Sequence, residues 1–257
     1  MSRLDGVYFM YEVPDMCDQW MPTLSIAMPI EEFHQMPRNA GYKYEYLGGQ
    51  ALLTPRPMTH HAKLDLATFS PQPNELAKDT IAVAEFRDAD RDDAVAAFAA
   101  SFSRVQPFAG IDDEVRRVAA RTCLERTWSG VDGVFVPSAS FTARDQGKLV
   151  GALLITLLPP GDLSDSNVYS WSDPPVADLW EKGEGHPHLT WIFVRPFDKG
   201  KGVGTSLLLH GANLLRGRGY PHLLSTFITG NESSILWHWR CGFELLPFEM
   251  SRRRSRS

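Results

Sequence analysis

The residues of this chain with the clearest chemical potential form a glycine-rich turn after an apolar run. The turn reads KGKGVGT, from Lys199 to Thr205. Glycine allows a backbone with positive φ and the close approach of another group. Successive peptide N–H groups in such a turn can point inward, and a helix that starts there adds unpaired N–H groups and the positive end of its dipole. With two lysines beside it, the turn predicts a cradle for a phosphate or pyrophosphate.

A plain structural interpretation of the turn is also open, because a glycine-rich turn before a helix is often only a turn. It is not one of the two common nucleotide-binding motifs. No Gly-Lys-Ser or Gly-Lys-Thr closes a G-x-x-x-x-G pattern, which excludes a Walker P-loop. The third glycine spacing and the downstream acidic residue of the dinucleotide fingerprint are missing as well.

The segments around the turn alternate between strand and helix patterns. The sequences HLTWIFV and HLLSTFI predict strands, and residues 204–216 and 233–243 predict helices. Further upstream we expect a strand at 81–86, helices at 90–102 and from 112 onward, and two strands within 140–158 joined by a turn at 145–147. This order predicts an α/β (α+β) fold with a mixed sheet.

The first part of the chain carries a hairpin signal. In YKYEYLGGQALLTPRP, Tyr42 to Tyr46 alternates, Gly48-Gly49 supplies a tight turn, and Ala51 to Thr54 continues extended. Because a lone hairpin is marginal in water, we expect it to pack on the main domain and to complete the sheet or cover its edge. The predicted organisation is an N-terminal extension over residues 1–78, a main domain over 79–250, and a basic, disordered tail over 251–257.

Two motifs in the last third of the chain belong together. The first is Val194-Arg195-Pro196 followed by Lys199-Gly200-Lys201-Gly202-Val203-Gly204. The second is Asn231, Ser234, His238 and Gly242-Phe243. As a pair they resemble the acetyl-CoA motifs of the GNAT family of N-acetyltransferases, over about residues 80–246. Lys199 stands where that family has Arg or Gln, and His238 stands where it usually has Tyr.

The resemblance implies a fold, a reaction and a cofactor. The fold is a GNAT-like three-layer one, with a mixed, mostly antiparallel central sheet flanked by helices, here with an N-terminal β-hairpin extension. The reaction is acetyl-CoA-dependent N-acetylation of an amine, on a small molecule or a protein, by direct attack in a ternary complex. The alternative is a non-catalytic acyl-CoA-binding regulatory module of the same fold. The implied contacts to acetyl-CoA (CoA) come from Phe193, Val194, Lys199, Gly200, Lys201, Gly202, Val203, Gly204, Thr205 and Asn231.

His238 is the catalytic residue that the resemblance implies, since the family's Tyr is the presumed general acid for the departing thiolate. An imidazolium can donate a proton near neutral pH. Two structural alternatives are also open. His238 can be a hydrogen-bonded structural residue between Trp237 and Trp239, and Asn231 can be a helix cap. The general base stays unassigned, with Glu184, His186, His188 and Glu244 as its candidates.

Two further features have a functional and a plain interpretation. The loop from Asp162 to Glu184 carries Tyr169, Trp171, Trp180 and acidic residues, which suits either a cationic amine or a solvated surface. His186 and His188, on either side of a proline, could be two ligands of a metal ion. Two histidines in a loop usually do not bind a metal, so no metal is predicted.

Composition narrows the remaining classes of function. The formal net charge of −5 argues against a large nucleic-acid footprint, despite the terminal SRRRSRS. The chain does not start like a signal peptide, and no apolar run approaches a membrane span. Cys17, Cys123 and Cys241 lie far apart, which predicts neither disulfides nor metal ligands. Cys241 is expected to be a buried core thiol, so no covalent acetyl-enzyme is predicted. We expect a cytoplasmic protein with a small-molecule or peptide amine acceptor and no nucleic-acid or membrane partner; a homodimer is left open.

Overall fold

The structure of this chain is a computed structural model. It describes residues 24–37, 42–55, 59–105, 108–109, 111–169, 171, 175–176, 178–228 and 231–246. The predicted basic tail at 251–257 and Cys17 lie outside these residues. Within the described part of the chain, no helix is long and apolar enough to cross a membrane.

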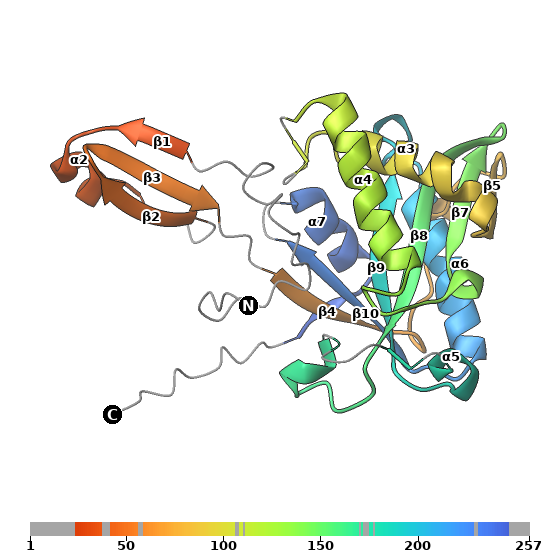
Figure 1. Ribbon diagram of the computed structural model, residues 1–257. Helices are drawn as coiled ribbons and strands as arrows, with labels where there is room; N and C mark the ends of the chain where they lie inside the picture. The colour runs from red at the N-terminus through yellow and green to blue at the C-terminus, as the bar shows by residue number, and fades with distance from the viewer. Residues whose placement is uncertain are drawn as a thin grey trace.

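A sheet of eight strands forms the centre of the main domain (Figure 1). Its order is β11-β4-β10-β9-β8-β7-β5, and β6 pairs with β8 off this path. Neighbouring strands are antiparallel except β9 and β10, which are parallel. The predicted mixed, mostly antiparallel sheet is therefore confirmed. The strands are β4 (Thr59–Asp65), β5 (Ile81–Glu85), β6 (Val134–Phe135), β7 (Phe141–Asp145), β8 (Lys148–Leu158), β9 (His186–Val194), β10 (His222–Ile228) and β11 (Glu244–Leu245).

Helices cover both faces of this sheet and complete three layers (Figure 1). The helices α3 (Arg91–Ser101) and α4 (Asp113–Trp128) lie on one face, and α6 (Val203–Gly217) lies on the other. The shorter α5 (Leu179–Lys182) and α7 (Glu232–Arg240) precede β9 and β11. The central strand β8 is apolar on both faces, so that Leu153 and Ile155 pack with α6 while Ala152 and Leu154 pack with α3 and α4.

The N-terminal hairpin is present and belongs to a separate sheet. The strands β2 (Tyr42–Leu47) and β3 (Gln50–Pro55) pair through the Gly48-Gly49 turn, where both glycines have positive φ, which confirms the hairpin prediction. The partner of β3 on its other edge is β1 (Leu24–Ala27), and α2 (Ile30–Gln35) contributes Phe33 to a small core with Ala51 and Leu53. The extension that joins the main sheet is β4, which lies between β10 and β11. The predicted boundary at residue 78 stays a prediction.

Residues 66–79, which we call the strap, connect β4 to β5 along α6. Near one end of α6, Arg216 donates from Nε to the carbonyl of Leu66 (2.8 Å) and from a terminal nitrogen to the carbonyl of Phe69 (2.9 Å). Near the other end, the backbone N–H of Ala77 donates to Ser206 Oγ (2.8 Å). The strap therefore follows α6 from its last turn back to its first turn.

Candidate functional site

The site begins where two parallel strands separate. The pairing of β9 with β10 covers only His188 opposite Leu224 and Leu189 opposite Ser225. β9 then continues to Val194 beside β8, whereas β10 continues to Ile228 beside β4. Past Leu189, the β10-facing edge of β9 has no ladder partner among the residues that the structure describes, and we call this unpaired edge the opening. A strand edge of this kind offers backbone donors and acceptors to a ligand.

The register of β8 and β9 decides which backbone groups face this opening. The N–H of Arg195 donates to the carbonyl of Val150 (2.8 Å), so Arg195 is bonded toward β8. Alternate residues of a strand direct their backbone groups to opposite edges. Phe193 therefore also faces β8, and Ile192 and Val194 face the opening. This differs from the predicted backbone role of Phe193, whose side chain packs with α3 and α4. The contact of Phe193 with the cofactor stays a prediction, and Ile192 and Val194 are the residues whose backbone groups face the opening.

The glycine turn follows β9 and starts α6, as predicted. Gly200 and Gly202 have φ of +77° and +78°, and Gly202 is the N-cap of α6. The N–H of Ser206 is the first to bond back into the helix, to Gly202 O (2.9 Å). The N–H groups of Val203, Gly204 and Thr205 therefore belong to the unpaired first turn. This is the arrangement that favours an anion at a helix N-terminus.

The two lysines of the turn differ in their surroundings. Both are exposed. Lys201 forms an ion pair with Asp198 (2.7 Å), whose carboxylate precedes the turn. Part of its charge is thereby offset locally, which leaves Lys199 as the better candidate to attract an anion.

The helix α7 closes the site from the other side. A β-carbon built on Gly204 would lie 3.2 Å from Nε1 of Trp237, so α7 approaches the first turn of α6 closely and any larger residue at 204 would press on the Trp237 ring. Nε1 of Trp237 is buried and has no hydrogen-bond partner among the described residues. Asn231 is the N-cap of α7 and accepts from the N–H of Ser234 (3.3 Å). The cap interpretation of Asn231 holds, and its contact with a ligand stays a prediction.

His238 lies inside the domain, between α7 and β10. It is 3% exposed and contacts the rings of Phe227 and Phe243. Nδ1 lies 2.8 Å from the carbonyl of Ser234, so it carries the proton and donates. Nε2 then accepts from the hydroxyl of Ser225 (2.8 Å). Burial lowers the pKa of His238 to about 4, which keeps the ring neutral at pH 7.

This geometry favours a structural role for His238, and its predicted catalytic role stays a prediction. In the variant His238→Phe, Ser225 and Ser234 lose their partner, which typically costs about 1–3 kcal/mol of unfolding free energy. We expect that loss in denaturant titrations, with kcat within about threefold of the original enzyme. A general acid would instead contribute about 10²–10⁴-fold. A kcat loss in that range, with the variant still folded, would restore the catalytic assignment.

The other candidates for acid–base or metal chemistry occupy different surroundings. Glu184 precedes β9 and Glu244 begins β11, and both are exposed. His186 bonds to His222 (3.1 Å), and His188 bonds to Thr190 (3.0 Å). Among the residues that the structure describes, no three His, Cys, Asp or Glu side chains are grouped to hold a metal. The base stays unassigned.

The aromatic residues of the 162–184 loop pack into the domain. Tyr169 is buried and lies 4.4 Å from the ring of His61. Trp171 donates to the carbonyl of Leu157, and Trp180 stacks on Tyr220. These three side chains therefore form neither a solvated surface nor a cage for a cation.

The two described cysteines are poor nucleophiles. Burial raises the pKa of Cys123 and of Cys241 to about 12. Since the thiolate is the reactive form, neither is suited to carry an acetyl group at neutral pH.

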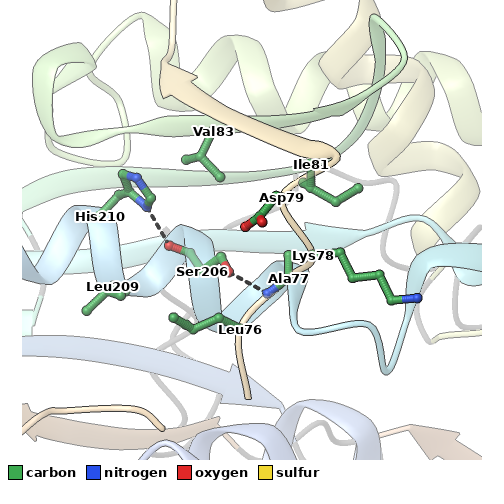
Figure 2. A pocket seen from close by; sticks show the side chains of 9 residues that line it. All are labelled: Leu76, Ala77, Lys78, Asp79, Ile81, Val83, Ser206, Leu209 and His210. Atoms are coloured by element: carbon green, nitrogen blue, oxygen red, sulfur yellow. Dashed lines mark hydrogen bonds between the residues drawn. The ribbon is translucent and has the colours of Figure 1, made fainter. Parts of the chain in front are cut away.

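A shallow hollow lies beside the first turns of α6, between this helix, the strap and β5. Figure 2 shows Ser206 bonded to the strap at Ala77, with Lys78 and Asp79 beyond it and His210 one turn further along α6. The strap thus separates this hollow from the glycine turn. None of the predicted site residues lines it.

Comparison with known proteins gives a family match and several similar solved structures. Residues 111–243 match the model of the acetyltransferase (GNAT) family. No curated protein matches the chain. Similar solved structures include PH1933 from Pyrococcus horikoshii OT3, at 16% identity over 66% of this chain and 92% of that one, with a TM-score of 0.45. PaiA N-acetyltransferase from Thermoplasma acidophilum, in complex with coenzyme A, matches at 12% identity over the same shares, also with 0.45. A GNAT family acetyltransferase from Brucella melitensis, in complex with acetyl-CoA, matches at 17% identity over 66% and 88%, with 0.42.

The match to the family model covers more than half of the chain. The chain therefore belongs to the acetyltransferase (GNAT) family, and it is an acetyltransferase with the fold of that family.

Proposed function

We propose that this protein transfers an acetyl group from acetyl-CoA to an amine, by direct attack within a ternary complex. The observation that carries the proposal is the opening between β9 and β10, which leads to the first turn of α6. Acetyl-CoA supplies the activated thioester when bound. Its long, polar arm and its pyrophosphate match an unpaired strand edge followed by a helix N-terminus.

The residues of the chain fit this cofactor in three places. The backbones of Ile192 and Val194 offer donors and acceptors along the opening. The N–H groups of residues 203–205 offer donors to a pyrophosphate. Trp237 adds a buried indole N–H with no acceptor among the described residues, and a missing partner of this kind is costly. Backbone donors also explain why Lys199 can replace the family's Arg or Gln.

Catalysis in this proposal rests on position and fixed dipoles. An N–H held at the opening would stabilise the oxyanion that forms when the amine attacks the thioester carbonyl. Neither Cys123 nor Cys241 is needed, since the acetyl group passes directly to the amine. The amine must lose its proton, and a water chain can remove it without an adjacent carboxylate.

The test is ligand-dependent stability followed by turnover. We expect acetyl-CoA at about 100 times its Kd to add about 2.7 kcal/mol of unfolding free energy. CoA should stabilise as well, and a pool of amines should release free thiol from acetyl-CoA. No stabilisation at saturating cofactor, confirmed by calorimetry, would contradict the proposal.

A pair of charge variants shows whether binding occurs at the glycine turn. Lys199 follows the end of β9, whereas Lys182 precedes its start, roughly 30 Å away for a strand of this length. Lys199→Glu should weaken CoA binding roughly tenfold at low salt, and Lys182→Glu should not. Equal losses in both would indicate a general charge effect.

The second candidate is a non-catalytic acyl-CoA-binding regulatory module. It is favoured by the buried, neutral His238 at the position of the family's Tyr. Stabilisation by acetyl-CoA without thiol release from any amine would support it. The proposal also includes an amine acceptor that is a small molecule or a peptide, a cytoplasmic location and no nucleic-acid partner. A homodimer is left open.

A further inference from the structure

Five polar side chains form a continuous row of hydrogen bonds across four strands, which we call the polar row. It runs from Thr156 on β8 through Thr190 and His188 on β9 to Thr226 on β10 and His61 on β4. The links measure 2.8 Å (Thr156 Oγ1 to Thr190 Oγ1), 3.0 Å (Thr190 Oγ1 to His188 Nδ1), 2.9 Å (His188 Nε2 to Thr226 Oγ1) and 3.2 Å (Thr226 Oγ1 to His61 Nδ1). All members except Thr226 are buried.

One direction of donation satisfies every link of the row, although the hydroxyl of Thr190 also lies within reach of the carbonyl of His188 (3.4 Å). The hydroxyl of Thr156 donates to the carbonyl of Asp132 (3.3 Å), so its oxygen accepts from Thr190. The oxygen of Thr190 then accepts from Nδ1–H of His188, and Nε2 of His188 accepts from Thr226. In this arrangement each hydroxyl proton is used once, and His188 is neutral. Burial lowers the pKa of His188 to about 3, which maintains that state.

Thr190 occupies a special place in the sheet. The β8–β9 register passes from Leu154 opposite Trp191 to Ile155 opposite Leu189, so Thr190 is the extra residue of a β-bulge. It is also the first residue of β9 beyond the last pair with β10. The bulge and the parting of the strands therefore coincide at one residue, and the polar row crosses from β9 to β10 at that point.

Stability alone does not account for these polar groups. Replacing two hydrogen-bonded partners by apolar groups of the same shape is often nearly neutral. Valine would suit the β-sheet at Thr156 and Thr190. Valine cannot form directional hydrogen bonds. The hydroxyl of Thr190, bonded on both sides, holds the bulge in one geometry.

We propose that Thr190, held by Thr156 and His188, is a positioning residue that sets the angle at which β9 leaves β10. In this way it places the backbones of Ile192 and Val194 for the acyl-CoA. This inference rests on the proposed function, since it concerns the same opening.

The test compares three single variants by calorimetry with CoA and by thermal melting. Thr190→Val removes the hydroxyl and keeps the shape, and Thr190→Ser keeps the hydroxyl. Thr142→Val is the matched control, because Thr142 is a buried threonine of β7 in the same sheet. We expect Thr190→Val to bind CoA about tenfold more weakly. Thr190→Ser and Thr142→Val should stay within about twofold of the original affinity.

A variant at a second position keeps the test valid if Thr190→Val does not fold. Thr156→Val breaks the same link from β8 and should give the same loss, and the double variant should lose little more than either single one. Unchanged CoA affinity in Thr190→Val or Thr156→Val, with the original protein binding CoA, would overturn the positioning role. If the original protein does not bind CoA, the proposed function fails instead.

Discussion

Acidification from pH 7 to pH 5 is expected to destabilise this protein strongly. His61, His188 and His238 are buried, and burial lowers their pKa values to about 4, about 3 and about 4. In the unfolded chain each titrates near 6.5. Between these values the unfolded state binds protons that the folded state does not, so stability is complete above pH 6.5 and falls below it. Each histidine should cost about 2 kcal/mol at pH 5.

Three such losses are comparable to the whole unfolding free energy of an ordinary domain. Asp132 acts in the opposite direction, because burial raises its pKa and its protonation in acid favours the folded state. Denaturant titrations at intervals between pH 7.5 and pH 5 measure the sum. His188→Asn should flatten the curve, whereas Thr142→Val should shift it equally at every pH. A constant unfolding free energy over this range would contradict the prediction.

Alanine at Gly202 is expected to be far more damaging than alanine at Gly200. Both glycines have positive φ, so either substitution costs about 1–2 kcal/mol from backbone strain. A β-carbon at Gly200 meets nothing within 4 Å. A β-carbon at Gly202 would lie 2.5 Å from the carbonyl oxygen of Leu76 and 2.6 Å from the nitrogen of Ala77. Because these are backbone atoms of the strap, the strap itself must move.

The added cost of Gly202→Ala should therefore exceed that of Gly200→Ala by at least about 2 kcal/mol. Moving the strap also breaks the bond from Ala77 to Ser206. Denaturant midpoints of the two variants provide the comparison. Equal losses would show that the strap does not hold this position in solution. The pair also separates two reasons for glycine in the motif. Gly202 is required by the packing of the strap, whereas Gly200 has no such neighbour, and its glycine can be explained by ligand binding.

Much of the main domain could be predicted from local pattern. The apolar strands at 188–194 and 222–228 and the glycine turn before α6 were placed correctly, because period and turn chemistry are local. Strand β4 was missed. Its sequence THHAKLD looks polar, and His61 is buried because residues distant in sequence, Thr226 of β10 and Tyr169, lie beside it. A strand from the N-terminal side is thus inserted between two strands from the C-terminal part, β10 and β11.

The site could be predicted only in part, for a related reason. The motifs located the turn and α7, but the inward residues of β9 depend on a register that a bulge shifts. The surroundings of the aromatic loop residues Tyr169, Trp171 and Trp180 were predicted wrongly. Their respective partners, His61, Leu157 and Tyr220, lie outside the loop in sequence. The polar row could not be seen at all, since its members come from four strands.

The position of β4 has a consequence for the order in which the protein folds during synthesis. Thr226 and His61 are bonded across 165 residues of chain. A ribosome releases the N-terminal part first, so β4 emerges long before β10 or β11 can flank it. Until then its backbone edges and the strap have no partners, and such edges invite pairing with other chains. During synthesis, β4 can therefore complete its pairing only after β10 and β11 have emerged, and the sheet at this edge is expected to close late.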